Sequence, residues 1–110
     1  MLKRDRRILY ELVHSKHLWE QRIAIITTIE FIKYNQFEDT LQVATILLQH
    51  RHALIHKAVG WALREIGKKD KHVLISFLDR QCTHMPRTML PYAIEHFNEA
   101  QRKEYLARKN

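Results

Sequence analysis

Glycine and proline are scarce in this chain, which holds only two of each among its 110 residues. Because these residues supply much of the material for turns, the shortage leaves few places at which a regular element can break. The sequence therefore reads as one helix after another with short connections. We predict a single all-α domain over residues 1–110, since this length has room for one domain.

Cysteine is scarcer still, and long apolar runs are missing. The single Cys82 excludes an internal disulfide and fits a reducing compartment, and its place in an apolar helical run predicts a buried, inert thiol. The basic start, MLKRDRR, is not followed by an apolar segment long enough for a signal peptide, and no run approaches a membrane span. We predict a soluble cytoplasmic protein with no membrane partner.

Positive charge, in contrast, is abundant. Nineteen Lys and Arg stand against twelve Asp and Glu, which gives a net charge of +7 and a pI of about 9.8. This balance favours a nucleic acid or another acidic surface as partner. A basic domain without such a partner is the alternative that composition leaves open.

Seven helices are predicted from the apolar periodicity and from the signals at helix ends. Asp70 and Asn98 are expected to cap the helices that follow them. Gly67 is expected to end a helix, and Pro86 to occupy a first turn. Pro91 falls inside the sixth helix, where it is expected to kink the helix or to shorten it to one later turn. The predicted ranges are Arg6–His14, Glu20–Tyr34, Glu38–His50, Ala53–Gly67, Lys71–Cys82, Pro86–Phe97 and Glu99–Arg108.

The predicted helices form pairs that repeat along the chain. The pairs begin near Glu20, Ala53 and Pro86, a spacing of 33 residues that suits stacked helical hairpins. Each pair has a cation in the first turn of its first helix, and in a solenoid such equivalent side chains line one surface. Coincidence in a chain so rich in Lys and Arg is the alternative. The residues of this predicted row are Arg22, Lys57 and Arg87.

The segment Leu54–Lys69 is predicted to form a helix with two unlike faces. At about 100° per residue, the side opposite the apolar stripe carries Lys57, Arg64 and Lys68 around the ring of Trp61. A solvated face is usually mixed in sign and free of tryptophan. We therefore expect this face to approach a polyanion, and packing of Trp61 against a neighbouring repeat is the alternative. The apolar stripe consists of Ile55, Val59, Ala62, Leu63 and Ile66.

Five stretches carry a specific pattern: WEQRIAI (Trp19–Ile25), FEDTL (Phe37–Leu41), LIHKAVGWALREIGKKD (Leu54–Asp70), FLDR (Phe77–Arg80) and MPRTMLPYAIE (Met85–Glu95). In this order they resemble the C-terminal part of bacterial DNA alkylation-repair enzymes, which are alkylpurine DNA glycosylases built from HEAT-like helical repeats. The resemblance covers nearly the whole chain. It implies a HEAT-like helical-repeat solenoid whose concave basic surface holds duplex DNA containing alkylated purines.

The resemblance also implies an activity and a set of site residues. The family excises cationic bases such as 3-methyladenine and 7-methylguanine in base excision repair, and two tryptophans and an aspartate contact the sugar and phosphate of the lesion. Trp61 matches the second tryptophan, Arg22 an arginine that grips the backbone, and Arg64 a further basic position. We expect no cofactor, no metal and a bacterial, nucleoid-associated location. The predicted DNA-binding residues are Arg22, Lys57, Trp61, Arg64, Lys68 and Arg87.

The chain also departs from the family pattern. The family's catalytic aspartate and first tryptophan belong to an Asn-Trp-Asp type segment upstream of the matched region, and no residue here matches either one. We therefore expect a C-terminal half that lacks the catalytic residue and is inactive alone. Pro91 stands where relatives usually show a basic residue. A half solenoid also leaves one core face uncapped, so we expect association through the N-terminal end.

Three histidines and Trp19 are further candidates for functional residues. His50, His52 and His56 are a metal cluster by residue type, but no carboxylate or cysteine joins them, and surface or capping histidines are the favoured reading. Trp19 precedes an apolar run at a helix start, which favours core packing over contact with DNA. Two other functions stay open: a non-catalytic DNA-binding relative, and a helical-repeat scaffold for acidic proteins.

Overall fold

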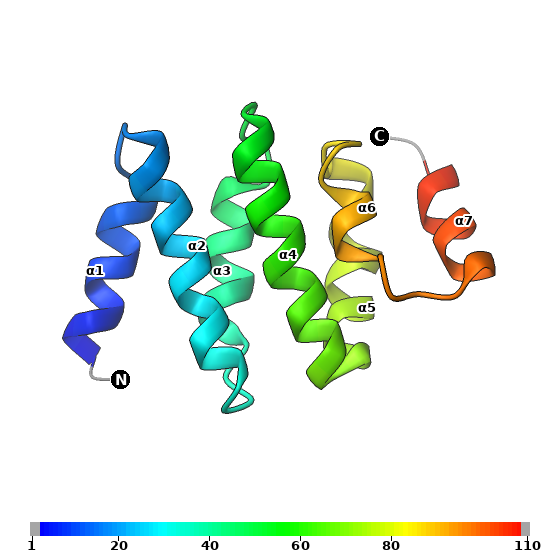
Figure 1. The fold of residues 1–110 in the computed structure, drawn as a ribbon, viewed down its shortest axis with the longest axis horizontal. Coiled ribbons are helices and arrows are strands. Elements are labelled where there is room, and N and C mark those ends of the chain that lie inside the picture. The colour runs from blue at the N-terminus through cyan, green and yellow to red at the C-terminus, as the bar shows by residue number, and fades with distance from the viewer. Residues whose placement is uncertain (1–2, 109–110) are drawn as a thin grey trace.

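The structure is a computed structural model that describes the backbone of residues 3–108 and the side chains from Arg6 to Arg108. Within these residues it contains seven α-helices, one short 3₁₀ helix and no strand (Figure 1), which confirms the all-α prediction. No helix in this part of the chain is long and apolar enough to cross a membrane. The elements are α1 (Lys3–Val13), α2 (Leu18–Ile32), α3 (Glu38–Leu47), α4 (Ala53–Lys69), α5 (Lys71–Gln81), η1 (Cys82–His84), α6 (Leu90–Ala93) and α7 (Glu99–Ala107).

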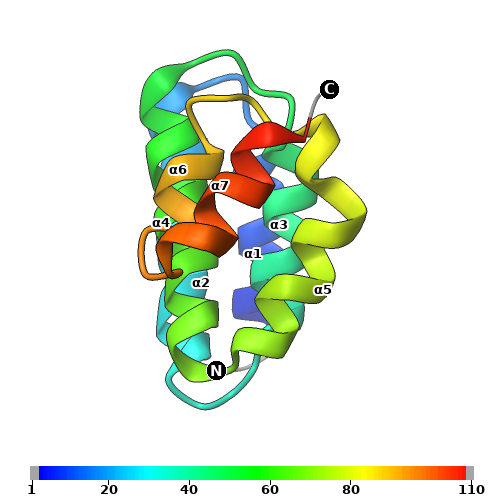
Figure 2. The ribbon, with the colours of Figure 1, turned by 90° about the vertical axis from the view of Figure 1, so that its right-hand side faces the viewer.

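The helices run up and down in alternation and pack in two layers (Figures 1 and 2). Helices α2, α4 and α6 lie side by side in the front layer of Figure 1, and α3 and α5 lie behind them. Helices α1 and α7 close the two ends. Helix α4 is central, because it packs against α2, α3, α5 and α6.

The core is built on the apolar side of α4. All five residues of the predicted stripe are 0% exposed, so that prediction is confirmed. Cys82 is also buried, as expected from its apolar surroundings in the sequence. Each fully buried Leu, Ile or Val side chain stabilises the fold by roughly 1.5–3 kcal/mol relative to exposure, so this stripe is a main source of cohesion between the layers.

Two tyrosine side chains connect the terminal helices to the back layer by hydrogen bonds. The hydroxyl of Tyr10 in α1 donates to Asp39 in α3 at 2.8 Å, and the hydroxyl of Tyr105 in α7 donates to Asp79 in α5 at 3.0 Å. Burial, reinforced by the accepting carboxylate, raises the pKa of each tyrosine to about 12. The reason is that ionisation would place a phenolate in a poorly solvated position beside a negative charge.

The sixth helix is much shorter than the predicted range Pro86–Phe97. Helix α6 has four residues, and Pro91 lies in its first turn. In a helix that began at Pro86, Pro91 would lie in the interior, where its missing N–H and its ring both disfavour the helix. The chain therefore forms a turn first, in which the Met89 N–H donates to the Pro86 carbonyl at 3.0 Å. The prediction of a first-turn Pro86 is wrong, and the shortening is attributable to Pro91.

The end of α4 also differs from the prediction. Helix α4 continues past Gly67 to Lys69, and Gly67 does not have a positive φ. Gly67 instead permits close packing, because a Cβ atom there would lie 2.5 Å from Cδ2 of Leu74. The two predicted caps are confirmed: Asp70 accepts from the His72 N–H at 3.1 Å and Asn98 from the Gln101 N–H at 2.8 Å.

The repeat in the front layer is longer than the predicted 33 residues. Helix α2 begins at Leu18 and α4 at Ala53, which are 35 positions apart. In the back layer, α3 begins at Glu38 and α5 at Lys71, 33 positions apart. Helix α6 begins at Leu90, 37 positions after Ala53, so the step along the front layer is not constant.

Candidate functional site

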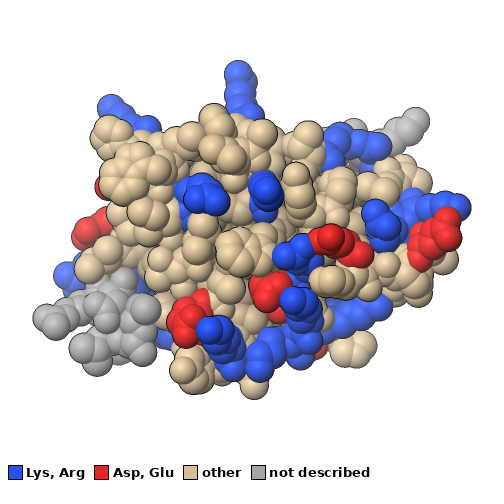
Figure 3. Space-filling model, viewed as in Figure 1, with Lys and Arg blue, Asp and Glu red and all other residues tan. Residues whose placement is uncertain are grey.

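The outer surface of the front layer carries a hollow of about 340 Å³, which we call the front hollow. Figure 3 views this face and shows Lys and Arg side chains over its middle, among mostly uncharged residues. Three helices of the front layer contribute to the front hollow, so it bridges successive repeats. Its lining residues are Arg22 from α2, Lys57, Ala58, Trp61 and Arg64 from α4, Tyr92 from α6, and Glu95 just after α6.

Two cations stand at the rim of the front hollow. Arg22 and Lys57 are exposed, and neither forms an ion pair with a described carboxylate. They occupy equivalent positions, 35 residues apart, because α2 and α4 start in the same register. Tyr92, 35 residues after Lys57, also lines the front hollow, whereas Arg87, the third cation of the predicted row, does not.

Two aromatic side chains, Trp61 and Tyr92, line the front hollow together with these cations. The Trp61 side chain is 37% exposed and lies one turn beyond Lys57, which confirms that this face of α4 is open to solvent. Tyr92 is 40% exposed and approaches α4 at Gly60, where a Cβ atom would lie 2.4 Å from Cβ of Tyr92. Because Gly60 has no side chain, α6 can place Tyr92 close to α4, the helix that carries Trp61.

A carboxylate changes the charge of the front hollow. Arg64 forms an ion pair with Glu95, and its Nε lies 3.8 Å from Glu65. Because Arg64 is half-buried, its position is defined by these partners rather than by solvent. The turn after α6 therefore adds a negative charge to the predicted cationic face of α4.

Two of the predicted DNA-binding residues lie outside the front hollow. Lys68 is one turn beyond Arg64 and pairs with Glu65 at 3.2 Å. Arg87 is exposed in the turn before α6. Sequence reasoning missed Tyr92, which a register of 35 would have found. It also missed Glu95, which no local pattern connects to Arg64.

Trp19 is not a core residue. Its side chain is 63% exposed, so the expectation of core packing is wrong. Helix α2 begins at Leu18, and Leu18 is the residue that packs against the core at this helix start. Trp19 and the buried Ile25 then lie about 120° apart around α2, since six residues at about 100° each come within 120° of a whole number of turns.

The histidines near the start of α4 have partners of their own. His50 hydrogen-bonds through Nε2 to Gln21 at 2.8 Å, and burial together with the charges of His52 and His56 lowers its pKa. His52 caps α4 by accepting from the Leu54 N–H at 3.1 Å. His56 is buried between the His50 carbonyl and the Thr88 hydroxyl. Among the described residues, no three His, Cys, Asp or Glu side chains are grouped to hold a metal ion.

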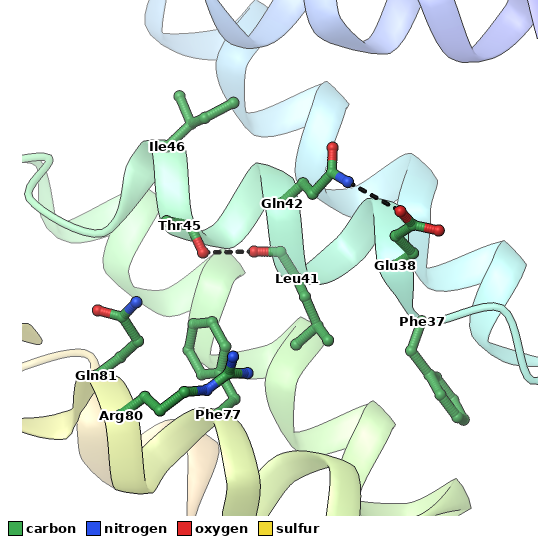
Figure 4. Close-up of a pocket in the computed structure, with 9 residues that line it drawn as sticks. All are labelled: Phe37, Glu38, Leu41, Gln42, Thr45, Ile46, Phe77, Arg80 and Gln81. Carbon is green, nitrogen blue, oxygen red and sulfur yellow. Dashed lines mark hydrogen bonds between the residues drawn. The ribbon is translucent and has the colours of Figure 1, made fainter.

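A larger hollow, of about 650 Å³, lies between α3 and α5 in the back layer (Figure 4). Its polar groups are engaged locally: Gln42 donates to Glu38 at 3.2 Å, and the Thr45 hydroxyl donates to the Leu41 carbonyl at 2.7 Å. Arg80 donates to the backbone of its own helix. No group of side chains converges there on a common point, so the front hollow is the candidate site.

Comparison with known proteins identifies one family. A sequence profile described as DNA alkylation repair enzyme matches residues 1–97. A search of curated proteins found no significant match, and a search of solved structures found none either. The matched residues include every residue that lines the front hollow.

Proposed function

Because the chain belongs to the DNA alkylation repair enzyme family, we propose that it is the DNA-binding portion of an alkylpurine DNA glycosylase. In this proposal the helix pairs form a HEAT-like solenoid, and the front hollow contacts the sugar–phosphate backbone of duplex DNA that contains alkylated purines. The protein acts in base excision repair in the bacterial cytoplasm, close to the nucleoid. The observation that supports the proposal is the meeting of Arg22, Lys57 and Trp61 in one open hollow.

The front hollow suits binding that does not depend on base sequence. Arg22 and Lys57 lie on neighbouring helices and form no ion pair with a described carboxylate, so both cations are open to contact phosphates. Such contacts position a duplex without reading its bases, and a repair protein has to bind any sequence. The exposed rings of Trp61 and Tyr92 add flat apolar surface that can lie against a sugar.

The chemistry of base loss defines what Trp61 contributes. A cationic alkylated purine is already a good leaving group, and the difficult step is the positive charge that develops on the deoxyribose. The face of a tryptophan attracts such a charge through its quadrupole, by roughly 0.5–2 kcal/mol. A nearby carboxylate would contribute more, as it does in sugar hydrolysis.

Three carboxylates of the described residues are engaged in other contacts. Glu95 lines the front hollow but pairs with Arg64. Asp39 accepts from Tyr10 and pairs with Arg6, and Asp70 caps α5. We therefore propose that the chain holds DNA and leaves the electrostatic role to a carboxylate that it does not supply. An assay of 7-methylguanine release by this chain tests that part, and release at a rate typical of glycosylases would contradict it.

Salt dependence of binding tests the DNA assignment. With about four phosphates engaged, the logarithm of the affinity for duplex DNA should fall with the logarithm of salt at a slope near −3.6, from ~0.9 per contact. Arg22→Ala should flatten that slope by about one unit. The matched control is Arg102→Ala on α7, which should change the slope little. A slope near zero would favour a scaffold for acidic proteins instead.

Self-association through the N-terminal end is the remaining part of the proposal. Size-exclusion chromatography coupled to light scattering measures it directly, and a mass of one chain at all concentrations would contradict it.

A further inference from the structure

Three turns of the chain lie at the same edge of the molecule, the upper edge in Figure 1. They join α1 to α2, α3 to α4, and η1 to α6, so each precedes a front-layer helix. They share the register of 35 that relates α2 to α4. Aligned by this step, the turns read HSKH at 14–17, QHRH at 49–52 and HMPR at 84–87. We call the surface of these three turns the turn edge.

The turn edge carries positive charges that no described carboxylate neutralises. Lys16, Arg51 and Arg87 are exposed, and none of them forms an ion pair with a described carboxylate. The three turns contain no Asp or Glu. Glu20, three residues after the first turn, accepts a hydrogen bond from the Ser15 hydroxyl at 2.6 Å. Figure 3 shows Lys and Arg side chains standing out along this edge with no acidic side chain standing out among them.

Hydrogen bonds connect the three turns to one another. Gln21 donates to the Ser15 carbonyl in the first turn at 2.8 Å and bonds to His50 in the second. His56 then links the His50 carbonyl to Thr88, which follows the third turn. The turns are thereby held in fixed relative positions before any ligand arrives. Such preorganisation lowers the entropy cost of binding a ligand that spans all three.

A polar hollow of about 540 Å³ lies between the second and third turns. It has room for a phosphate group. Basic or hydrogen-bonding side chains contribute much of its wall, and they come from both turns. The lining residues are Gln49, His50, Arg51, His56, Thr83, His84 and Pro86.

The turn edge is continuous with the front hollow. Arg22 lies five residues after His17, and Lys57 lies five residues after His52. At 1.5 Å per residue, each pair is separated by about 7.5 Å along its helix. A nucleic-acid strand advances about 3.4 Å per nucleotide, so a backbone that touches the front hollow reaches the turn edge within two or three nucleotides.

We propose that the turn edge is a second phosphate-binding surface, which holds the backbone of duplex DNA beyond the front hollow through Lys16, Arg51 and Arg87. The inference rests on the proposed function, because the same duplex occupies both surfaces. His17 and His52 add ring N–H groups that can donate to phosphate oxygens. Because each of the three turns contributes one cation, the DNA strand is contacted at several points along the row of turns.

The test compares three variants of the full chain by fluorescence anisotropy with a labelled, undamaged duplex across a salt series. The turn variant is Lys16→Ala with Arg51→Ala and Arg87→Ala. The hollow variant is Arg22→Ala with Lys57→Ala. The matched control is Lys69→Ala with Arg80→Ala and Arg102→Ala, which removes the same charge from exposed positions elsewhere. All substituted side chains are exposed, and circular dichroism checks that helix content is unchanged.

The turn edge adds three phosphate contacts to the roughly four assigned above, so the wild-type slope should lie nearer −6.3, from ~0.9 per contact. The turn variant should flatten this slope by about 2.7 units and the control by less than half a unit. Equal slopes for the turn variant and the control would overturn the inference, and a flatter slope in the hollow variant alone would then leave the proposed function standing. A flatter slope in the turn variant alone would support the turn edge and contradict the front hollow. If polyglutamate binds the wild-type chain with the affinity and slope of the duplex, phosphate recognition is overturned.

Discussion

Glu95 determines how much positive charge the front hollow presents to solvent. Its carboxylate holds the guanidinium of Arg64, which otherwise would extend the line of cations begun by Arg22 and Lys57. The pair is partly exposed, so it contributes little to stability and mainly affects the local field. Residue-scale contacts of this kind tune affinity without altering the fold.

Replacing Glu95 by Gln should strengthen binding to duplex DNA by roughly three- to tenfold, because Arg64 becomes available for a phosphate and a repelling carboxylate is lost. The salt slope should steepen by about 0.9 from the added contact. Anisotropy titrations measure both quantities. Glu99→Gln is the control, since Glu99 is an exposed carboxylate that pairs with Lys103 at 3.1 Å on α7. An equal gain in both variants would show that only net charge matters.

The predictable residues of the front hollow are those whose positions follow from helical spacing alone. Lys57 and Trp61 share a face of α4. Arg22 lies 35 residues before Lys57, at the equivalent position of α2. Glu95 was not predictable, because its contact with Arg64 depends on a short helix and the turn that follows it. Trp19 was misassigned because the helix start lies at Leu18, which turns the ring away from the core.

At the scale of elements, the contact between α4 and α6 depends on a missing side chain. Gly60 lies inside α4, where alanine has the higher intrinsic helix preference by roughly 1 kcal/mol. A Cβ atom there would nevertheless meet the backbone oxygen of Met89 at 2.9 Å as well as Cβ of Tyr92. Neither atom is the flexible tip of a side chain, so relief requires α6 to move.

Gly60→Ala should therefore lower the free energy of unfolding by up to about 2 kcal/mol, because overpacking of about 1–3 kcal/mol outweighs the gain of about 1 kcal/mol in helix preference. Urea denaturation followed by circular dichroism measures the change. Gly67→Ala is the matched control, since its Cβ atom would meet only the Cδ2 tip of Leu74, which can rotate away. If the two variants are equally stable, the close approach of α6 is not a constraint.

Element boundaries were predictable where a cap or a charged first turn marks them. The starts of α3, α4, α5 and α7 are the predicted Glu38, Ala53, Lys71 and Glu99. The C-terminal ends of the helices were less predictable. Glycine often ends a helix, but Gly67 lies inside α4, where its missing side chain allows Leu74 of α5 to pack closely. For α6, a proline inside an apolar run shortened a helix whose pattern alone extends over three turns.

At the scale of the whole molecule, the stack is closed at each end by a tyrosine that donates to a carboxylate. Tyr10 and Tyr105 both have a pKa raised to about 12, above the ordinary value of 10. A group whose pKa is higher in the folded state contributes stability fully below its unfolded pKa and loses it as pH rises through the folded value. Both ends should therefore loosen over the same alkaline range.

The free energy of unfolding should fall as pH rises from about 10 to about 12, and Tyr10→Phe and Tyr105→Phe should each make that fall shallower. Denaturation series at several alkaline pH values measure it. Tyr34→Phe is the control, because the Tyr34 side chain is 70% exposed and fastens no helix end. A fall of the same steepness in all three variants would contradict the assigned role of the two hydrogen bonds.

The overall arrangement was predictable as stacked helix pairs, but its exact register was not. The starts of α3 and α5 in the back layer are 33 positions apart, whereas those of α2, α4 and α6 in the front layer are 35 and 37 positions apart. The difference arises because the connections in the two layers need not match in length. Tyr92 lines the front hollow and the predicted Arg87 does not, and this difference depends on how α6 packs beside α4.

Both tryptophans of the chain lie outside its core, with Trp19 63% and Trp61 37% exposed. Trp19 should therefore emit at a wavelength closer to that of indole in water than Trp61, whose surface is mostly covered by protein. The same property makes emission a label-free report on the outer surface of the front layer. In a Trp19→Phe background, the remaining signal comes from Trp61 alone, so quenching on addition of DNA would follow occupancy of the front hollow at a single ring.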